Sequence, residues 1–260
     1  MPLAQAGALR VFRFDSFPEN EISHGVLSRK GGISPPPWES LNVGGNLGDA
    51  PERVAENRQR AFNALALDLS QAFDVWQVHS ATILPVTRPR RGEPLIQADG
   101  MVTDRPGLTL FMRFADCVPI LAYDPRRRAV GIAHAGWLGT VHQTARALVR
   151  AMVDSFGTRP EDLVTGLGPS IAAHHYPVGA EVVDQILASM GPRAEAHVLR
   201  EDGRTHLDLW SANRWQLEQE GVGHIELSGL CTACDLDHWY SHRGEHGRTG
   251  RLGAVISLHA

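Results

Sequence analysis

Two histidines and one cysteine that lie far apart in the sequence share one context, the ends of short apolar segments. His79 and His134 each close an apolar stretch, and Cys117 lies between two apolar runs. Side chains at strand ends can converge on one rim of a sheet, which holds them rigidly. Two imidazoles and one thiolate can form an open zinc site, because three protein ligands leave a fourth position for water or substrate. Such a zinc ion lowers the pKa of its bound water to about 7.

The spacing of these three residues matches no short metal-binding motif, so two other interpretations stay open. Cys117 could be a small buried hydrophobic residue, with the two histidines hydrogen-bonded at strand ends. It could also be a nucleophile that a histidine base activates.

Cys231 and Cys234 form a C-x-x-C pair that is followed by His238 and His242. A ββα zinc finger needs about 12 residues between its cysteine and histidine pairs, whereas only three separate Cys234 from His238. A thioredoxin-like motif requires a βαβ context, which is not seen here. We therefore expect a structural role or a chance occurrence for the pair.

Arginines provide candidate anion contacts. Arg58 lies in an expected helix, and its planar guanidinium could hold a phosphate through two bonds; a solvated helix face is the alternative. Arg29 and Lys30 precede two glycines whose backbone N–H groups could form an anion nest. The arginines within 88–91 and 126–128 have no interleaved aromatic residues, so we interpret them as solvated turns and not as a nucleic-acid surface.

Short apolar segments bounded by turn residues must position these side chains. Strands are expected at 75–79, 108–112, 119–123, 129–134 and 253–258. Helices are expected at about 140–153, 179–190 and 207–220, and another begins after Asp49, its expected N-cap, with Pro51 in the first turn. The strands come in adjacent groups, which favours an α+β class with mixed sheets layered against helices over a doubly wound parallel sheet.

Composition excludes several classes of protein. The chain has 260 residues with 25 basic and 29 acidic side chains, and this mild acidity argues against wholesale binding to nucleic acid or an anionic membrane. No apolar run approaches the roughly 18 residues that span a bilayer, and the first residues lack the features of a secretory signal. Three cysteines are too few for a disulfide framework, so we expect a cytoplasmic protein.

A series of short motifs in a fixed order resembles one family. The motifs are Ser28-Arg29-Lys30-Gly31-Gly32, Gln77-Val78-His79, Ala115-Asp116-Cys117-Val118-Pro119, His134-Ala135-Gly136-Trp137, Tyr240-Ser241-His242-Arg243 and Thr249-Gly250-Arg251. In this order they resemble the YfiH-type family, which is labelled "laccase domain" or polyphenol oxidase and is described as purine nucleoside phosphorylases. The resemblance runs from about residue 22 to the C-terminus.

The resemblance implies a fold and a metal. The fold is a single α+β domain over residues 1–260, with mixed sheets packed between helices and with residues 1–20 as a peripheral segment. The metal is a zinc ion bound by His79, Cys117 and His134, with copper as the alternative.

The resemblance also implies roles for further residues. Arg58 matches the position of the family's active-site arginine, so Arg58 and Cys117 are the implied catalytic residues, and Arg58 is an implied contact of phosphate or substrate. Arg29 is a further candidate for that contact. Asp99 and Asp116 are candidates for that contact and for the general acid, because Asp99 adjoins Gly100 of the motif Ala98-Asp99-Gly100 and Asp116 adjoins the proposed metal ligand Cys117.

The family's activities are phosphorolysis of adenosine, inosine, guanosine and S-methyl-5'-thioadenosine, and deamination of adenosine. The expected partners are purine nucleosides and phosphate, and monomer and homodimer stay equally open. Three other hypotheses are a copper-dependent polyphenol oxidase, a peptidoglycan-precursor editing amidase and a non-catalytic binding domain. The chain has no H-x-H pair of the kind that assembles a multi-copper cluster.

Overall fold

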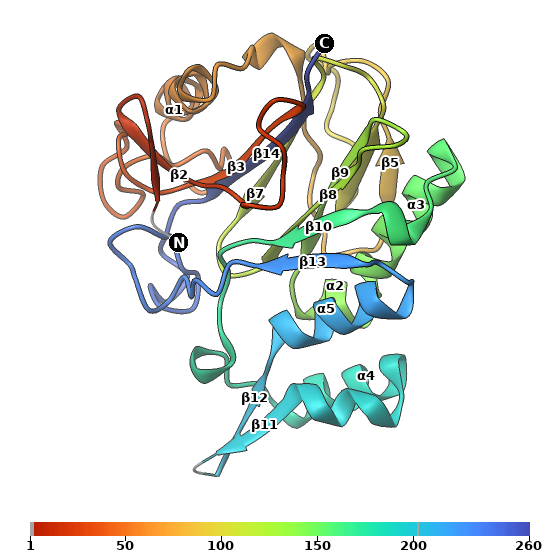
Figure 1. Ribbon diagram of the computed structural model, residues 1–260. Coiled ribbons are helices and arrows are strands. Elements are labelled where there is room, and N and C mark those ends of the chain that lie inside the picture. Colours follow the sequence, from red (N-terminus) through yellow and green to blue (C-terminus); the bar gives the residue numbers. More distant parts are fainter. Residues whose placement is uncertain (1–2, 202) are drawn as a thin grey trace.

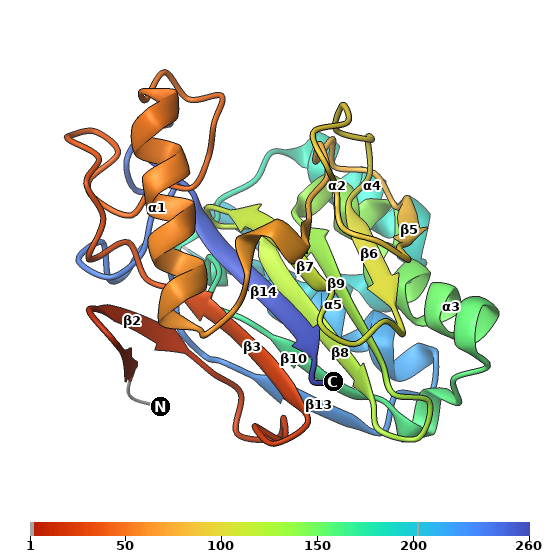
Figure 2. The same ribbon diagram turned by 90° about the horizontal axis from the view of Figure 1, so that it is seen from above.

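Hydrophobic side chains form three buried clusters, each between two layers of secondary structure. The computed structural model describes residues 3–201 and 203–260. One cluster lies between helix α1 (Pro51–Ala64) and the first sheet, the second between the two main sheets, and the third between the second sheet and the remaining helices. Figure 2 shows α1 on the outer side of one sheet and α3 (Thr144–Phe156) on the outer side of the other. The order of layers is therefore helix, sheet, sheet, helices.

The first sheet is mostly antiparallel, and the last strand of the chain lies near its centre. In spatial order its strands are β1 (Ala4–Ala6), β2 (Leu9–Phe12), β3 (Ile22–Leu27), β14 (Leu252–Leu258), β7 (Thr109–Phe114) and β4 (Ala72–Phe73).

The second sheet is mixed and includes the pair β8 and β9, which positions the candidate site. In spatial order its strands are β13 (His224–Leu227), β10 (Val164–Leu167), β8 (Val118–Asp124), β9 (Ala129–Ala135), β6 (Gly100–Thr103) and β5 (Ile83–Pro85). A separate hairpin, β11 (Val198–Glu201) and β12 (Arg204–Leu207), lies beside α4 in Figure 1.

Helices cover the outer face of the second sheet (Figure 1). Besides α3 they are α2 (Trp137–Val141), α4 (Ala180–Met190) and α5 (Leu209–Gln219). Among residues 3–201 and 203–260 there are also four short 3-10 turns: η1 (Leu69–Gln71), η2 (Pro160–Asp162), η3 (Ala173–His175) and η4 (Pro192–His197).

Successive side chains of a strand point to opposite faces of the sheet, and both faces of the central strands are covered. These strands therefore appear in the sequence as continuous apolar runs. In β9, Val130 and Ile132 face the cluster between the sheets, while Ala129 and Ala133 face the helices. Because both faces of the strand are covered, every residue of β9 is buried. The predicted α+β class with mixed sheets packed between helices is confirmed, as are the strands at 108–112, 119–123, 129–134 and 253–258, with shifted ends.

The strand expected at 75–79 is wrong. Only Trp76 makes a bridge, with Gln97, and the side chains of Trp76 and Val78 are exposed. His79 has a left-handed backbone with φ of 62°, so it cannot close a strand. His79 is therefore a loop residue.

Two details of the expected helices are also wrong. The helix expected at 140–153 is two helices, because Gln143 adopts a left-handed conformation with φ of 61° between α2 and α3. Asp49 is not the N-cap of α1, which is Ala50. The carboxylate of Asp49 instead accepts hydrogen bonds from Asn42 Nδ2 at 3.0 Å and Arg53 Nε at 2.9 Å, and so braces the preceding loop.

Several strands gave no recognised sequence signal, among them β1 to β3, β10 and β13. Residues 1–20 were expected to be peripheral. Their described part forms the edge strand β1 and its neighbour β2, and the side chains of Phe12, Phe14 and Phe17 are buried between the sheets.

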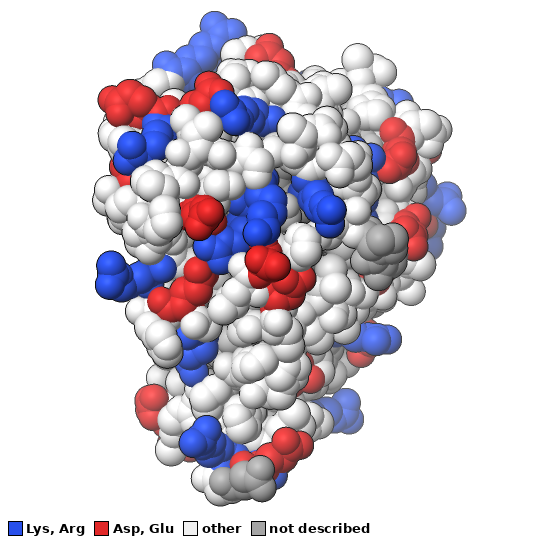
Figure 3. All heavy atoms as spheres, turned by 90° about the vertical axis from the view of Figure 1, so that its left-hand side faces the viewer, with Lys and Arg blue, Asp and Glu red and all other residues white. Residues whose placement is uncertain are grey.

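Within the described residues, no helix is both long and apolar enough to cross a membrane. On the face shown in Figure 3, basic and acidic side chains are interspersed, and the described residues there form no continuous basic stripe.

The buried amide of Asn57 connects α1 to the loop that follows β3. Its Nδ2 donates to Ser34 Oγ at 2.8 Å and to the Asn42 carbonyl at 2.9 Å, and its Oδ1 accepts from the Ile33 N–H at 2.9 Å. This loop continues to Gly44 and the residues beyond it, so Asn57 sets the path of a segment that reaches the candidate site.

We expect Asn57→Ala to lower the free energy of unfolding by about 2–4 kcal/mol, because it leaves several buried polar groups unpaired. Chemical denaturation at fixed pH measures this difference. Gln59→Ala, on the exposed side of the same helix, is the control and should change the value by less than about 0.5 kcal/mol. A loss below 1 kcal/mol for Asn57→Ala would show that the loop re-forms its hydrogen bonds without the amide.

Candidate functional site

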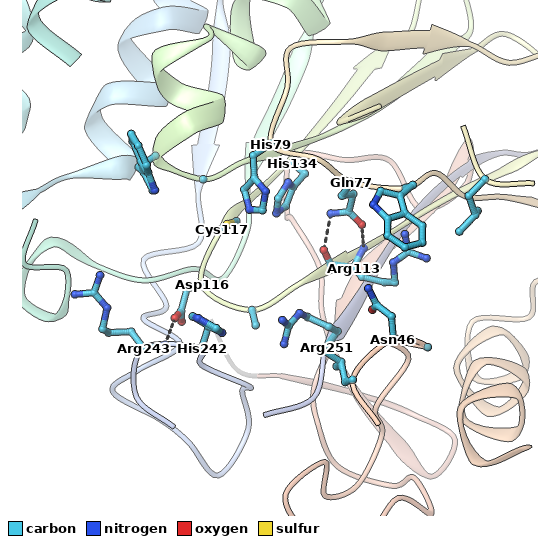
Figure 4. A pocket seen from close by; sticks show the side chains of 18 of the residues that line it. Asn46, Gln77, His79, Arg113, Asp116, Cys117, His134, His242, Arg243 and Arg251 are labelled. Carbon is cyan, nitrogen blue, oxygen red and sulfur yellow. Dashed lines mark hydrogen bonds between the residues drawn. The ribbon is translucent and has the colours of Figure 1, made fainter. Parts of the chain in front are cut away.

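The three ligand candidates come together, although they belong to three separate segments. One ligand atom from each of His79, Cys117 and His134 lies within 4.8 Å of the others. The rings of His79 and His134 are 5.0 Å apart between centroids and meet edge to face. Figure 4 shows the three side chains gathered at one side of a cavity.

Strand pairing places two of the three ligands. Strands β8 and β9 are antiparallel, and their register sets Val118 opposite Ala135 and Pro119 opposite His134. Cys117, one residue before β8, therefore lies next to the end of β9. The expected positions of Cys117 between two strands and of His134 near the end of its strand are confirmed.

A buried carboxylate, Asp99, orients the two histidines. His134 Nδ1 lies 2.9 Å from Asp99 Oδ1, which leaves the Nε2 atom of the ring for a metal, in the arrangement common for metal-binding histidines. Asp99 Oδ2 accepts from the backbone N–H groups of Val78 at 3.1 Å and Ser80 at 2.6 Å. These bonds hold the strained loop that carries His79.

The charges of the cluster favour a thiolate. Burial raises the pKa of the Cys117 thiol, but the charge on His134 and hydrogen bonds from His134 and His79 outweigh this effect and lower it to about 6. Burial lowers the pKa of His134, whereas the charge on Cys117 and the hydrogen bond to Asp99 raise it to about 9. Cys117 thus carries the negative charge that a soft divalent metal ion prefers in a ligand.

The cluster opens into a cavity of about 770 Å³, within the usual range for small-molecule sites. The aromatic residues in its walls are Trp76, Trp137 and Tyr176. Its cationic lining residues are Arg58, Arg113, Arg243 and Arg251. Arg113 and Arg251 lie on the wall beside the ligand cluster in Figure 4.

Three guanidinium groups surround the single carboxylate of Asp74. Arg90 Nε lies 2.6 Å and Arg113 Nη1 3.1 Å from its oxygens, while Arg58 Nη1 is 3.7 Å away, beyond hydrogen-bond length. Burial lowers the pKa of Arg113 to about 10 against the charge of Asp74, so the group stays protonated at neutral pH. The cluster has an excess of positive charge, and Arg58 has capacity left for an anion.

The predicted substrate contacts fall into two groups. Arg58 and Asp116 line the cavity. Asp116, however, is engaged by Thr232 Oγ1 at 2.6 Å and by the Arg243 N–H at 2.6 Å, so it holds two loops together. Asp99 is fully buried behind His134 and does not line the cavity.

Arg29 lies outside the cavity. Its Nη1 is 2.9 Å from Glu245 Oε1 and also donates to the Leu236 carbonyl at 2.9 Å. A side chain at Gly32 would collide with the Ser40 carbonyl at 2.1 Å, so the double glycine permits close packing of backbone and forms no open anion nest. Arg29 is a structural residue.

Sequence reasoning assigned no role to Arg113, Arg243 or Arg251. Two of these arginines had a signal in the sequence. Arg113 is a charged residue inside the apolar run of β7, and Arg251 ends one of the family motifs. Gln77 was also missed. Its side chain accepts from the Arg113 N–H at 3.0 Å and donates to the Arg113 carbonyl at 2.7 Å, which ties the His79 loop to β7.

Gly136 leaves room for the cysteine sulfur. A Cβ atom built on Gly136 would lie 2.6 Å from Cys117 Sγ and 3.5 Å from His79 Cδ2. The backbone of Gly136 has φ of −81°, which any residue adopts, so an alanine there acts on the cluster only through its methyl group.

We expect Gly136→Ala to weaken binding of Zn²⁺ to this cluster by about 10- to 100-fold, because the methyl group displaces the sulfur. Competition with a chromophoric chelator measures the affinity. Gly45→Ala is the control, since its Cβ would lie 3.9 Å from Arg58 Nη2, at ordinary contact distance. Equal affinities for both variants would contradict the proposed ligand geometry.

Comparison with known proteins shows which family the chain is similar to. Residues 23–259 match the family described as "Multi-copper polyphenol oxidoreductase laccase". A Deinococcus radiodurans protein named "Purine nucleoside phosphorylase" is 39% identical over 242 residues, which are 93% of this chain and 91% of that protein. A Bacillus subtilis protein named "Purine nucleoside phosphorylase YlmD" is 34% identical over 247 residues, 92% and 89% of the two chains.

A solved structure is similar over nearly the full length. The crystal structure of YlmD from Geobacillus stearothermophilus has a TM-score of 0.93 and 34% identity, and the match covers 99% of this chain and 98% of that one. The fold is therefore the single α+β domain of that protein. As the order of its motifs predicted, the chain belongs to the laccase-domain family, together with relatives named YfiH and YlmD.

Proposed function

We propose that the chain is a zinc-dependent purine nucleoside phosphorylase that also deaminates adenosine. The observation that carries the proposal is one cavity with two unlike parts, an open His-Cys-His ligand set and a wall of arginines. The names of the relatives support the reaction class. The proposed substrates are adenosine, inosine, guanosine and S-methyl-5'-thioadenosine, which phosphate cleaves to free base and ribose 1-phosphate.

The donor set suits zinc. His79, Cys117 and His134 would hold the ion and leave one position open, as in catalytic zinc sites. When bound there, zinc supplies a Lewis acid and a water that ionises near neutral pH. Cys117 acts in this proposal as a metal ligand and not as a nucleophile. Copper is the alternative metal, and metal analysis of the purified protein separates the two.

The arginines would position phosphate. In phosphorolysis a phosphate oxygen forms a bond to C1' of the ribose while the bond from C1' to the purine nitrogen breaks. Arg58 and Arg113 hold the attacking dianion and offset its charge through guanidinium hydrogen bonds. Because these groups are already held by Asp74 and the backbone, they need little reorganisation when phosphate binds.

The aromatic residues would hold the base. Trp76 is 48% exposed although it lines the cavity, and a large aromatic side chain left uncovered is suited to stack on a planar ligand. Trp137 and Tyr176 provide further apolar surface. Deamination replaces the amino group at C6 of adenine with oxygen from water and releases ammonia, so it requires no phosphate.

We expect Cys117→Ala and His79→Ala to lower both activities by at least about 100-fold, because each removes a ligand of the metal. Incubation of the variants with adenosine, with and without phosphate, and separation of adenine and inosine by chromatography measures the two reactions. His224→Ala, an exposed histidine on the edge strand β13, is the control. Full turnover by the ligand variants, or copper-dependent oxidation of phenols without turnover of purines, would contradict the proposed function.

We expect Arg58→Ala to raise the KM for phosphate by about 10- to 100-fold, the effect of losing one or two charged hydrogen bonds. Deamination of adenosine and zinc content should stay close to wild type, because neither requires phosphate. Arg60→Ala removes an exposed arginine from the same helix and is the matched control. An unchanged phosphate dependence in Arg58→Ala would remove this residue from the phosphate site.

A further inference from the structure

A second group of metal-ligand side chains lies outside the cavity. His174 and His175, the last two residues of η3, meet Cys231 and Cys234 of the C-x-x-C pair. One ligand atom from each of the four residues lies within 4.8 Å of the others. Cys231 is buried, and the other three are exposed.

Two separations in this group match those of a tetrahedral zinc site. With Zn–S near 2.3 Å and Zn–N near 2.0–2.1 Å, neighbouring donors in a tetrahedron lie about 3.3–3.8 Å apart. His175 Nδ1 is 3.5 Å from Cys234 Sγ and 3.7 Å from Cys231 Sγ. His174 Nε2 lies 3.0 Å from Cys234 Sγ, which is shorter than in such a site, so ion binding would move this exposed ring outward by about 0.5 Å.

The backbone holds the two halves of the group in place. Ser170 and Cys231 form a parallel bridge, in which the Thr232 N–H donates to the Ser170 carbonyl at 3.1 Å. The Ala172 N–H also points at Cys231 Sγ, at 3.3 Å. This contact fixes the Cys231 sulfur against the segment that leads into η3.

The histidines that follow the C-x-x-C pair in the sequence are not its partners. His238 Nδ1 lies 2.9 Å from Asp235 Oδ2, and His242 lines the cavity. The partners are the adjacent pair His174 and His175, which no local motif connects to the cysteines. The structure thus joins the C-x-x-C pair to two specific histidines, an arrangement compatible with the expected structural role.

We infer that His174, His175, Cys231 and Cys234 bind a second zinc ion as a closed, structural site. Four protein ligands fill the tetrahedral shell, which leaves no open position for water or substrate. The two thiols lose their protons to solvent when the ion binds. This inference does not depend on the proposed enzymatic function.

The site would stabilise one wall of the cavity. Tyr176, directly after His175, lines the cavity and packs under the Arg243 guanidinium at 4.9 Å. Thr232, within the C-x-x-C pair, donates to Asp116, the neighbour of the proposed ligand Cys117. An ion joining residues 174–175 to 231–234 therefore links two segments that both contact the cavity.

The test is the zinc content of purified, full-length protein, grown with zinc and measured by mass spectrometry after gel filtration. We expect two zinc ions per chain in wild type and one each in Cys117→Ala and Cys234→Ser. The double variant should hold none. His238→Gln, a histidine near the same cysteines, is the control and should keep two.

Cobalt provides a readout that is independent of activity. In the Cys117→Ala background, added Co²⁺ should give the intense visible absorption of a tetrahedral site with thiolate ligands, and His175→Gln should weaken it at least severalfold. No such absorption at saturating Co²⁺, or a disulfide between Cys231 and Cys234 in protein kept under reducing conditions, would overturn the inference. Loss of activity in Cys117→Ala with one zinc retained would separate this site from the catalytic one.

Discussion

The buried carboxylate of Asp99 is the interaction on which the candidate metal centre depends. Burial raises the pKa of this group, but hydrogen bonds from His134 and Ser80 outweigh that effect and lower it to about 2. A charge buried in this way is tolerated only when its oxygens are fully hydrogen-bonded. Asp99 meets this requirement by binding a side chain in the second sheet and the backbone of the loop that carries His79. One group thus orients two ligands.

The cavity combines rigid strands with loops from distant parts of the chain. Strands β8 and β9 hold Cys117 and His134, while the loop after β3 brings Gly44 to Asn46 to the opposite wall. Asn57 fixes that loop from α1, and Gln77 ties the His79 loop to β7. Loops placed on a rigid scaffold commonly carry function, because they can vary while the layers beneath them stay packed.

Charge divides the cavity into two regions with different chemistry. The ligand cluster carries a thiolate suited to a metal ion, and the arginine wall is only partly neutralised by Asp74. Such a division is compatible with the proposed pairing of a neutral nucleoside with a phosphate dianion. The tetrad of His174, His175, Cys231 and Cys234 lies outside the cavity, so the two ligand clusters of the described residues have different surroundings, one on the cavity wall and one apart from it.

The sequence by itself determined the fold class, most central strands and which three side chains, His79, Cys117 and His134, meet as candidate ligands. The strands could be predicted because strands that are buried on both faces appear in the sequence as continuous apolar runs. The three candidate ligands could be identified because the motifs that contain them follow one another in the order typical of the family. Only the tertiary structure decided that His79 lies in a strained loop, that Arg29 is structural and that the C-x-x-C pair meets His174 and His175. Local pattern cannot supply these outcomes, because each depends on contacts between segments far apart in the chain. Such contacts are set by strand register and buried hydrogen bonds, which leave no periodic signal.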